Sequence, residues 1–428
     1  MKTLYIILAA CGLMFAQNLN SVGLGYAGNY TVMSRGLDAL DYNPANLAMF
    51  RRYANEINLV NTGLALGNSV FNLNSYNRFF TREGHGGTLS VAERVDLLTL
   101  FGNDGLGFDF KVQSRLFAFA AGHWGGSVSL TGQGKGAIVP GKPLEMLLFG
   151  STVGEDFGFS EQDVLAAEAY SAIKSGLSYA YRIKLNREKT GFSYLAIGAT
   201  FNYFAGLGYA RTTQSEISVQ RSAENADQFV SAASFAVQKA DILSGKLAGS
   251  GFGMDLGITA RYKRAVHLSL AVTNVGANIG WSGNAQQIQF SQRDTSDIGG
   301  TASGSFSATD TTAINPFSTP LPSTLSFGAS LRLFAPLKIA LEYRQGLDNY
   351  FGNSKRAQFG AAILYKPFSW LPLRSGVSVG GRAGFQWGVG MGLHLGPIAL
   401  DMSYALKGAV LPMEATGVYS GISLRLRY

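Results

Sequence analysis

The stretch that decides the fold is Gly421-Ile-Ser-Leu-Arg-Leu-Arg-Tyr428, the last eight residues of the 428-residue sequence. In an extended strand, successive side chains point to opposite faces. The even-numbered residues of this stretch are Ile, Leu, Leu and Tyr, whereas the odd-numbered residues 423–427 are Ser, Arg and Arg. An apolar row requires hydrocarbon or a core, and arginines require water or a charged partner. The pattern therefore predicts a strand between an apolar and a polar environment.

The same alternation recurs along most of the chain. In each further stretch every second residue is apolar or aromatic, and the residues between are small or charged. A helical period of 3.6 residues fits none of them. Several apolar rows finish on tyrosine, which is typical of the interfacial girdle of a membrane barrel. The stretches are 177–183, 195–203, 254–262, 325–333, 337–343 and 398–406.

Composition favours a membrane protein over a set of soluble domains. Charged residues make up 14% of the chain, compared with about 25% in ordinary soluble domains. The net charge of +8 raises the question of a nucleic-acid partner. However, the basic pairs at 51–52, 187–189 and 263–264 are scattered among predicted turns, so we expect no basic patch and no nucleic-acid partner.

Residues 1–16 are predicted to be an export signal. Lys2 provides the positive charge, residues 4–15 are apolar, and cleavage is expected after Ala16. The only cysteine, Cys11, completes a lipoprotein-type Leu-Ala-Ala-Cys box, and the alternative is an ordinary cysteine of the apolar region. No later run reaches the roughly 18 apolar residues of a membrane-spanning helix.

Only helices and closed barrels can cross a bilayer with every backbone group paired. We therefore predict an all-β fold, a transmembrane antiparallel β-barrel of about 14 strands at about 10 residues each. It would lie in the outer membrane of a Gram-negative-type bacterium. Residues 17–52 would form a small lumenal hatch ahead of the barrel, which would span residues 53–428.

Short and long connections alternate, as in outer-membrane barrels with short periplasmic turns and long external loops. Short turns are predicted at 263–264, 335–336, 366–372 and 396–397, and long loops at 139–169, 206–249 and 281–322. Three loop helices are predicted at 91–101, 161–174 and 223–243. The first begins with a Ser90–Glu93 capping box.

The segment after the signal does not alternate. It contains glycines and the block Tyr42-Asn-Pro-Ala-Asn-Leu-Ala48. Asn is a favourable helix N-cap and Pro is favourable at the first helical position, so a short helix is expected from Pro44 to about Phe50. The candidate hatch residues are Gly23, Gly25, Asp38, Asn43, Pro44 and Ala45. The alternative is that Asn43 merely caps a helix that starts a packed plug.

These residues resemble the FadL/PorV-like superfamily of outer-membrane barrels. The opening glycines, Asp38-Ala39 and the Asn-Pro-Ala block are similar to its N-terminal plug, and the stretches 268–276 and 321–328 are similar to strands of the PorV-like branch. The resemblance implies a 14-stranded barrel with a hatch in its lumen. One branch takes up hydrophobic compounds such as fatty acids passively. The other is an accessory or scaffold of protein secretion and surface attachment.

Two sets of residues are candidates for binding. Charges on the inward strand faces could hold a carboxylate headgroup, or they could pair with one another across the lumen. These are Arg182, Asp255, Arg261, Arg332, Glu342, Arg344, Asp401 and Arg425. Apolar residues of the first long loop could form a hydrophobic pocket, or they could pack under loop helices. These are Leu144, Leu147, Leu148, Phe149, Phe157 and Phe159.

The expected partners are the outer-membrane bilayer, a hydrophobic ligand and, in the second branch, secretion-system proteins. The four histidines have no metal-site spacing, and no nucleophile motif stands in a strand-turn-helix context. We therefore expect no enzyme activity, metal or cofactor. Arginine at Leu341 or Leu400, on the predicted lipid face, should cost more stability than at Ala340 or Ala399, on the lumen face.

Overall fold

The computed structural model describes residues 19–428 except 103–104, 140, 150–157, 223–227, 244, 264 and 298–301. The predicted signal at 1–16 lies outside the described residues. Across the described chain, none of the helices has both the length and the apolar character needed to span a membrane.

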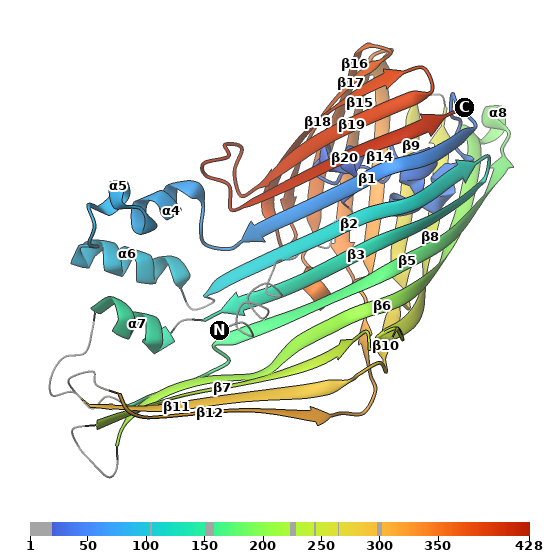
Figure 1. The fold of residues 1–428 in the computed structure, drawn as a ribbon. Coiled ribbons are helices and arrows are strands. Elements are labelled where there is room, and N and C mark those ends of the chain that lie inside the picture. The colour runs from blue at the N-terminus through green and yellow to red at the C-terminus, as the bar shows by residue number, and fades with distance from the viewer. Residues whose placement is uncertain are drawn as a thin grey trace.

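Fourteen antiparallel strands form a closed barrel, which confirms the predicted fold class. The ring closes where the first strand pairs with the last along most of their length (Figure 1). The strands of the ring are, in order, β1 (Asn55–Asn68), β2 (Leu106–Ala121), β3 (Trp124–Ile138), β5 (Leu165–Lys184), β6 (Phe192–Arg221), β8 (Gly249–Tyr262), β9 (Val266–Val275), β14 (Thr324–Phe334), β15 (Leu337–Gly346), β16 (Gln358–Phe368), β17 (Leu371–Gly380), β18 (Gly384–Leu395), β19 (Ile398–Lys407) and β20 (Gly417–Arg427).

The two faces of each strand differ as the alternation predicts. In β15, Leu341 is 64% exposed on the outside of the ring, whereas its neighbours Ala340 and Glu342 are 2% and 4% exposed. In β20, Ile422 is exposed and Arg425 is buried. An apolar outer wall around a polar inner wall is the arrangement of a barrel that meets lipid.

The barrel has a short-turn end and a long-loop end. At the short-turn end, residues 335–336 and 396–397 connect strands as predicted. The turn predicted at 366–372 is smaller, because Lys366–Phe368 extend β16 and β17 begins at Leu371, which leaves residues 369–370. Helix α8 (Arg187–Thr190) lies at this end, between β5 and β6.

Strands extend beyond the ring at the long-loop end, where loops were predicted. The 30-residue strand β6 continues past the ring and pairs there with further strands, which project in Figure 1 as a long ribbon. The additional strands are β4 (Phe159–Gln162), β7 (Gln228–Asp241), β10 (Asn278–Trp281), β11 (Gln286–Asp297), β12 (Ala302–Ala313) and β13 (Phe317–Pro320).

Two of the predicted loop helices are wrong. Within the helix predicted at 223–243, residues 228–241 form β7, whose backbone pairs with β6 on one side and β11 on the other, and residues 223–227 lie outside the described residues. The helix at 161–174 is replaced by the end of β4 and the start of β5, which pairs with β3 and β6. In both segments, pairing with two neighbouring strands outweighs the helix propensity of alanine-rich sequence.

The third predicted helix, 91–101, matches α6 (Val91–Phe101), and Ser90 and Glu93 form its capping box. It lies with other helices beside the long-loop end in Figure 1, outside the ring. These are α4 (Leu73–Phe80), α5 (Arg82–His85) and α7 (Gly141–Phe149).

Residues 19–52, called here the lumen segment, lie inside the ring (Figure 1). The segment contains α2 (Ser21–Leu24), η1 (Gly36–Asp38), α3 (Ala39–Tyr42) and η2 (Pro44–Ala48). Leucines of the segment pack against inward alanines of the wall, such as Ala180 and Ala196. Small wall residues thus make room for a plug of short helices.

Candidate functional site

The lumen segment packs against strands on several sides of the barrel. Element η2 packs against β5, β6 and β8, and α2 packs against β18, β19 and β20. Of the candidate residues in this segment, Asp38, Asn43, Pro44 and Ala45 are all buried. Gly23 lies against the ring of Tyr42, and Gly25 ends α2 close to Ser403 of β19.

Asn43 joins the start of η2 to the wall. Its side-chain oxygen accepts a hydrogen bond from the backbone N–H of Ala45 at 3.0 Å, which is the N-cap expected from the sequence. Its Nδ2 atom donates to the Ser269 hydroxyl at 2.6 Å and to the carbonyl oxygens of Ile258 and Leu270 at 3.2 Å. One side chain therefore both caps η2 and binds strands β8 and β9.

Two paired glycines of the wall face this contact. Gly198 of β6 is opposite Gly257 of β8. A Cβ atom on Gly257 would overlap the Asn43 side-chain oxygen, and one on Gly198 would overlap the backbone of Pro44 and Ala45. The Asn-Pro-Ala block therefore depends on glycine at both wall positions for its close approach.

Arg425 connects the lumen segment to the last strands of the ring. Its Nη1 atom lies 2.9 Å from an Asp38 carboxylate oxygen and 3.9 Å from a Glu56 oxygen. Its Nη2 atom lies 3.6 Å from Asp401, which also pairs with Arg374 at 2.6 Å. This network of buried charges links the segment to β1, β17, β19 and β20.

A second polar network links the segment to β15. Glu342 accepts hydrogen bonds from the Thr31 backbone N–H at 2.8 Å and from its hydroxyl at 2.7 Å. Arg344 pairs with Glu342 at 3.1 Å and donates to the Gly28 carbonyl. Glu342 and Arg344 thus bind the lumen segment at Thr31 and Gly28.

The other predicted lumen charges lie apart from these networks. Asp255 binds Lys174 at 3.3 Å and accepts from Asn202 at 2.8 Å. Arg182 lies over the Tyr194 ring, with 5.8 Å between its guanidinium carbon and the ring centroid. Arg261 and Arg332 lie at the short-turn end. The eight predicted charges are therefore spread over several sides of the barrel. Ion pairs are formed by Asp255, Glu342, Arg344, Asp401 and Arg425.

The lumen has a small polar cavity on the long-loop side of the segment. Its volume is about 90 Å³, and Asp41, Tyr42, Lys111, Gln133 and Lys174 are among its lining residues. The loop element η3 (Tyr350–Gly352) reaches this region. Gln133 donates to the Phe351 carbonyl, and the Phe351 ring lies 4.6 Å from that of Tyr170.

A larger cavity, called here the basic vestibule, lies at the short-turn end. Its volume is about 870 Å³. Nine arginines and lysines line it: Arg35, Arg51, Arg52, Arg332, Lys338, Lys366, Arg374, Arg425 and Arg427. Three carboxylates also line it: Asp38, Glu56 and Asp401. The expectation that the basic residues form no patch is therefore wrong, because short turns distant in the sequence meet around one mouth.

Crowding of positive charge in the vestibule affects Arg35 of the lumen segment. Burial lowers the pKa of its guanidinium, and the nearby charges of Arg332 and Arg261 lower this pKa further. Its Nη1 atom donates to the Phe50 carbonyl at 3.2 Å.

The wall itself is interrupted between β1 and β2. Backbone pairing runs from Asn55 to Ile57 and resumes only at Thr62, although every residue between is described. At the same level, each of the two strands also has a register shift in the pairing with its other neighbour. The shift lies next to Leu59 where β1 pairs with β20, and next to Leu116 where β2 pairs with β3. As a result, two consecutive apolar residues face outward in each strand: Leu59 and Val60, and Leu116 and Phe117.

Behind the interruption, the lumen segment contacts the wall. Arg115, which is 3% exposed, pairs with Asp41 of the segment. The Asn58 side chain donates to the Arg115 carbonyl at 3.1 Å and spans the two strands where their backbones do not pair.

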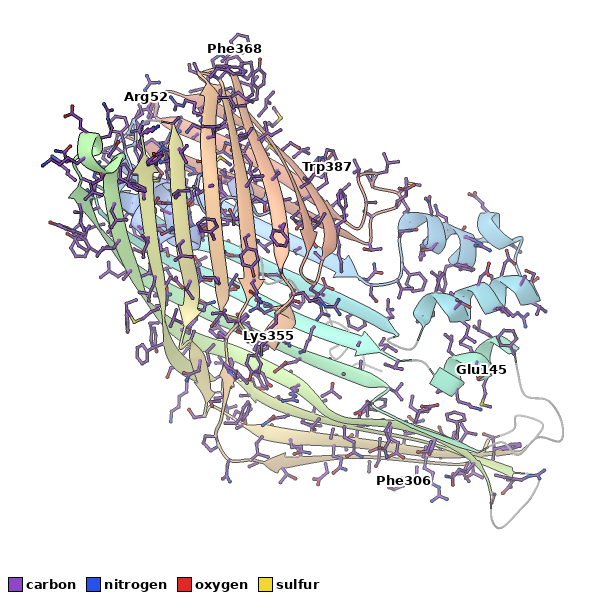
Figure 2. The ribbon with its side chains drawn as sticks, turned by 180° about the vertical axis from the view of Figure 1, so that it is seen from behind. Arg52, Glu145, Phe306, Lys355, Phe368 and Trp387 are labelled. Carbon is purple, nitrogen blue, oxygen red and sulfur yellow. The ribbon has the colours of Figure 1, made fainter. Side chains whose placement is uncertain are left out.

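The apolar loop residues that the structure describes do not line either lumen cavity. Four of them lie in α7, beside α6 and outside the ring; Figure 2 labels Glu145 in this helix. Leu147 is 81% exposed, whereas Leu144 and Leu148 are half-buried. Phe159 lies in β4, and Phe157 lies outside the described residues. A ligand pocket at α7 stays a prediction.

Several residues of the site were missed from the sequence. Ser21, Glu56, Arg115 and Arg374 contact or support the lumen segment, and Lys338 lines the vestibule. For Lys338, the available signal was a basic residue close to the predicted turn at 335–336. In the part of the chain that the structure describes, no three His, Cys, Asp or Glu side chains are grouped to hold a metal ion.

Comparisons with known proteins agree with the fold. Residues 44–402 match a family described as "Family of unknown function (DUF5723)". No curated protein matches the chain. The toluene transporter TodX of P. putida is 11% identical, with 97% of this chain and 99% of that chain covered and a TM-score of 0.55.

Two further structures are similar. A deltaS2S3 mutant of TodX, described as a monoaromatic hydrocarbon channel, is 11% identical, with coverage of 96% and 100% and a TM-score of 0.54. A FadL homologue of Pseudomonas aeruginosa is 13% identical, with coverage of 98% and 99% and a TM-score of 0.47. The chain thus shares its fold with the TodX structures, whereas the PorV-like part of the resemblance stays a prediction.

Proposed function

The chain belongs to the DUF5723 family, and we propose that it is an outer-membrane channel for the passive uptake of hydrophobic small molecules. In this proposal the lumen segment is the hatch. The observation that carries it is the position of one segment between two lumen cavities, of about 90 Å³ and about 870 Å³. Displacement of that segment would join them. The name of the toluene transporter, which has this fold, supports a hydrophobic substrate.

The interruption between β1 and β2 is the proposed exit into the membrane. If these two strands can separate, a hydrophobic compound can pass from the lumen directly into the bilayer without entering water, which is the favourable route for apolar surface. Unpaired backbone is costly in lipid, yet here Asn58 replaces part of the missing ladder and apolar side chains cover the outside. Movement of Asp41 with the hatch would release Arg115 directly behind this point.

In this proposal the short-turn end faces the periplasm and the long-loop end faces outward. The strand ribbon and helices α4–α7 would then lie on one side of the external mouth. The layout follows that of bacterial outer-membrane barrels.

A second candidate function is a non-transporting accessory or scaffold barrel for protein secretion or surface attachment. The observation that favours it is the small outer cavity, about 90 Å³, whereas sites for drug-sized ligands measure about 300–1,000 Å³. In this case the lumen segment would be a permanent filler, and the elements beyond the barrel would contact the partner.

Uptake of a labelled long-chain fatty acid and of a labelled monoaromatic compound into liposomes separates the two functions. The refolded barrel would be compared with an Asn43→Ala/Pro44→Gly double variant, and an Asn186→Ala variant in the exposed helix α8 is the control. Protein-dependent uptake that changes only in the double variant supports the channel. Uptake no greater than in empty liposomes, with a folded barrel, contradicts it and favours the scaffold.

A further inference from the structure

The basic vestibule has an excess of positive charge that its own residues do not neutralise. We propose that it binds the oxyanion headgroup, phosphate or carboxylate, of a single-chain amphiphile. This site would exist whether or not the barrel conducts, so it does not rest on the proposed channel function.

Each of the three carboxylates in the vestibule lies within ion-pair distance of Arg374 or Arg425. Asp401 pairs with Arg374 at 2.6 Å and with Arg425 at 3.6 Å. Asp38 pairs with Arg425 at 2.9 Å, and Glu56 approaches the same guanidinium at 3.9 Å.

Of the nine cations, the other seven form no ion pair with a carboxylate of the described residues (nine minus Arg374 and Arg425). They include Lys338 and Lys366 on the wall, and Arg35 from the lumen segment. Like charges that share one cavity repel each other, and such a cavity concentrates anions. A bound oxyanion would reduce this repulsion.

Arg374 lines the same cavity and is largely buried in its wall. Arg374 is only 7% exposed, and its Nη2 atom pairs with Asp401. The planar guanidinium group is suited to phosphate and carboxylate oxygens. Seven of the nine lining cations are arginines, which favours an oxyanion over a neutral ligand.

Exposed apolar side chains beside the cations favour an amphiphile over a free anion. Phe50 is 74% exposed and Trp370 is 42% exposed, and both line the vestibule. Trp370 stacks on Phe368 with 5.5 Å between ring centroids. Figure 2 shows Phe368 and Arg52 at the same end of the barrel. A short alkyl chain could cover these rings while its headgroup contacts the cations.

The test is calorimetric titration of the full-length refolded barrel in phosphatidylcholine nanodiscs, with empty nanodiscs subtracted. Four probes separate the two parts of the ligand. Octyl phosphate and octanoate carry both an anionic headgroup and an alkyl tail. Inorganic phosphate has the anionic group without the tail, and octanol has the tail with an uncharged hydroxyl group. We expect octyl phosphate and octanoate to bind more tightly than either of the other two.

The matched variants are Lys338→Gln/Lys366→Gln in the vestibule and Lys355→Gln/Arg356→Gln at the opposite end, where Figure 2 labels Lys355. Both remove two positive charges. The first should weaken octyl phosphate binding about tenfold, as expected when charged hydrogen-bond donors are lost, and the second should leave it unchanged. Equal effects of the two variants, or no binding of octyl phosphate, would overturn the site. Equally tight binding of inorganic phosphate would overturn the assignment to an amphiphile.

Discussion

The Nδ2 atom of Asn43 lies 2.6 Å from the Oγ atom of Ser269, so the residue that caps η2 also ties the lumen segment to strand β9. The same nitrogen donates to two wall carbonyls, of Ile258 and Leu270. A single side chain therefore determines both the local helix start and the position of the segment in the barrel.

Replacing Asn43 with alanine should lower the free energy of unfolding of the barrel by about 2–3 kcal/mol, because a helix cap and buried hydrogen bonds to the wall are lost together. Urea titration of tryptophan fluorescence in detergent would measure this. The control is Asn186→Ala, which removes the cap of α8 at an exposed turn. We expect about 1 kcal/mol or less for the control. Equal losses in the two variants would show that the wall contacts add nothing.

Replacing Gly257 with alanine should increase the ionic conductance of the barrel in planar bilayers. The new methyl group would overlap the Asn43 side chain, and overpacking of this kind costs about 1–3 kcal/mol. The lumen segment would then shift from its seat. Gly208→Ala in β6 is the control, because its Cβ atom would lie 3.6 Å from the nearest atom, the Ser171 hydroxyl. Wild-type conductance in a folded Gly257→Ala barrel would contradict this seating.

Replacing Leu341 with arginine should destabilise the barrel by about 2–4 kcal/mol, since the charge would face lipid near the midplane. The sequence alone also suggested that Ala340→Arg would be well tolerated. The structure changes that expectation, because Ala340 is 2% exposed and packs with residues of the lumen segment. We expect the Ala340→Arg barrel to assemble with its lumen segment displaced and sensitive to protease. Heat-modifiable gel migration reports assembly, and normal assembly of Leu341→Arg would contradict the assignment of the lipid face.

Backbone amides at the interruption between β1 and β2 should exchange with deuterium faster than those of the continuous ladder from Thr62 to Asn68. β1 still pairs with β20 here, so only the amides that face the other strand lack a ladder partner, and such amides open at low free energy. The regular pairing of β9 with β14 provides the internal reference. Equal protection of residues 58–61 and 62–68 in mass spectrometry would remove the support for an exit at this place.

The barrel could be predicted because its strands must satisfy two environments at once. In β15, the alternation of Leu341 with Ala340 and Glu342 is visible in the sequence and matches the exposed and buried faces. The capping box at Ser90 likewise depends on neighbouring residues only, and α6 begins there.

Elements whose structure depends on distant partners could not be predicted. The segment of β7 has Phe229, Ala233 and Val237 at helical spacing, but β6 and β11 pair with its backbone on both sides. The basic vestibule likewise depends on residues that are distant in the sequence. Lys338 and Arg35 are about 300 positions apart in the sequence, and only closure of the ring around the lumen segment brings them to one cavity.

The most direct test of a gated channel is a reversible lock between the lumen segment and the wall. The hydroxyl oxygens of Ser21 and Ser423 are both buried and lie 2.7 Å apart. Cysteines at both positions could form a disulfide with a sulfur–sulfur distance of about 2.05 Å. The variant would carry Cys11→Ser, which removes the only native cysteine.

Uptake of a labelled hydrophobic compound into liposomes would be measured for the same Ser21→Cys/Ser423→Cys protein before and after reduction, with each single cysteine variant as a control. The channel with a mobile hatch predicts little uptake in the oxidised protein and recovery to the wild-type rate on reduction. Equal uptake in the two states would contradict a hatch that moves away from β20 during transport.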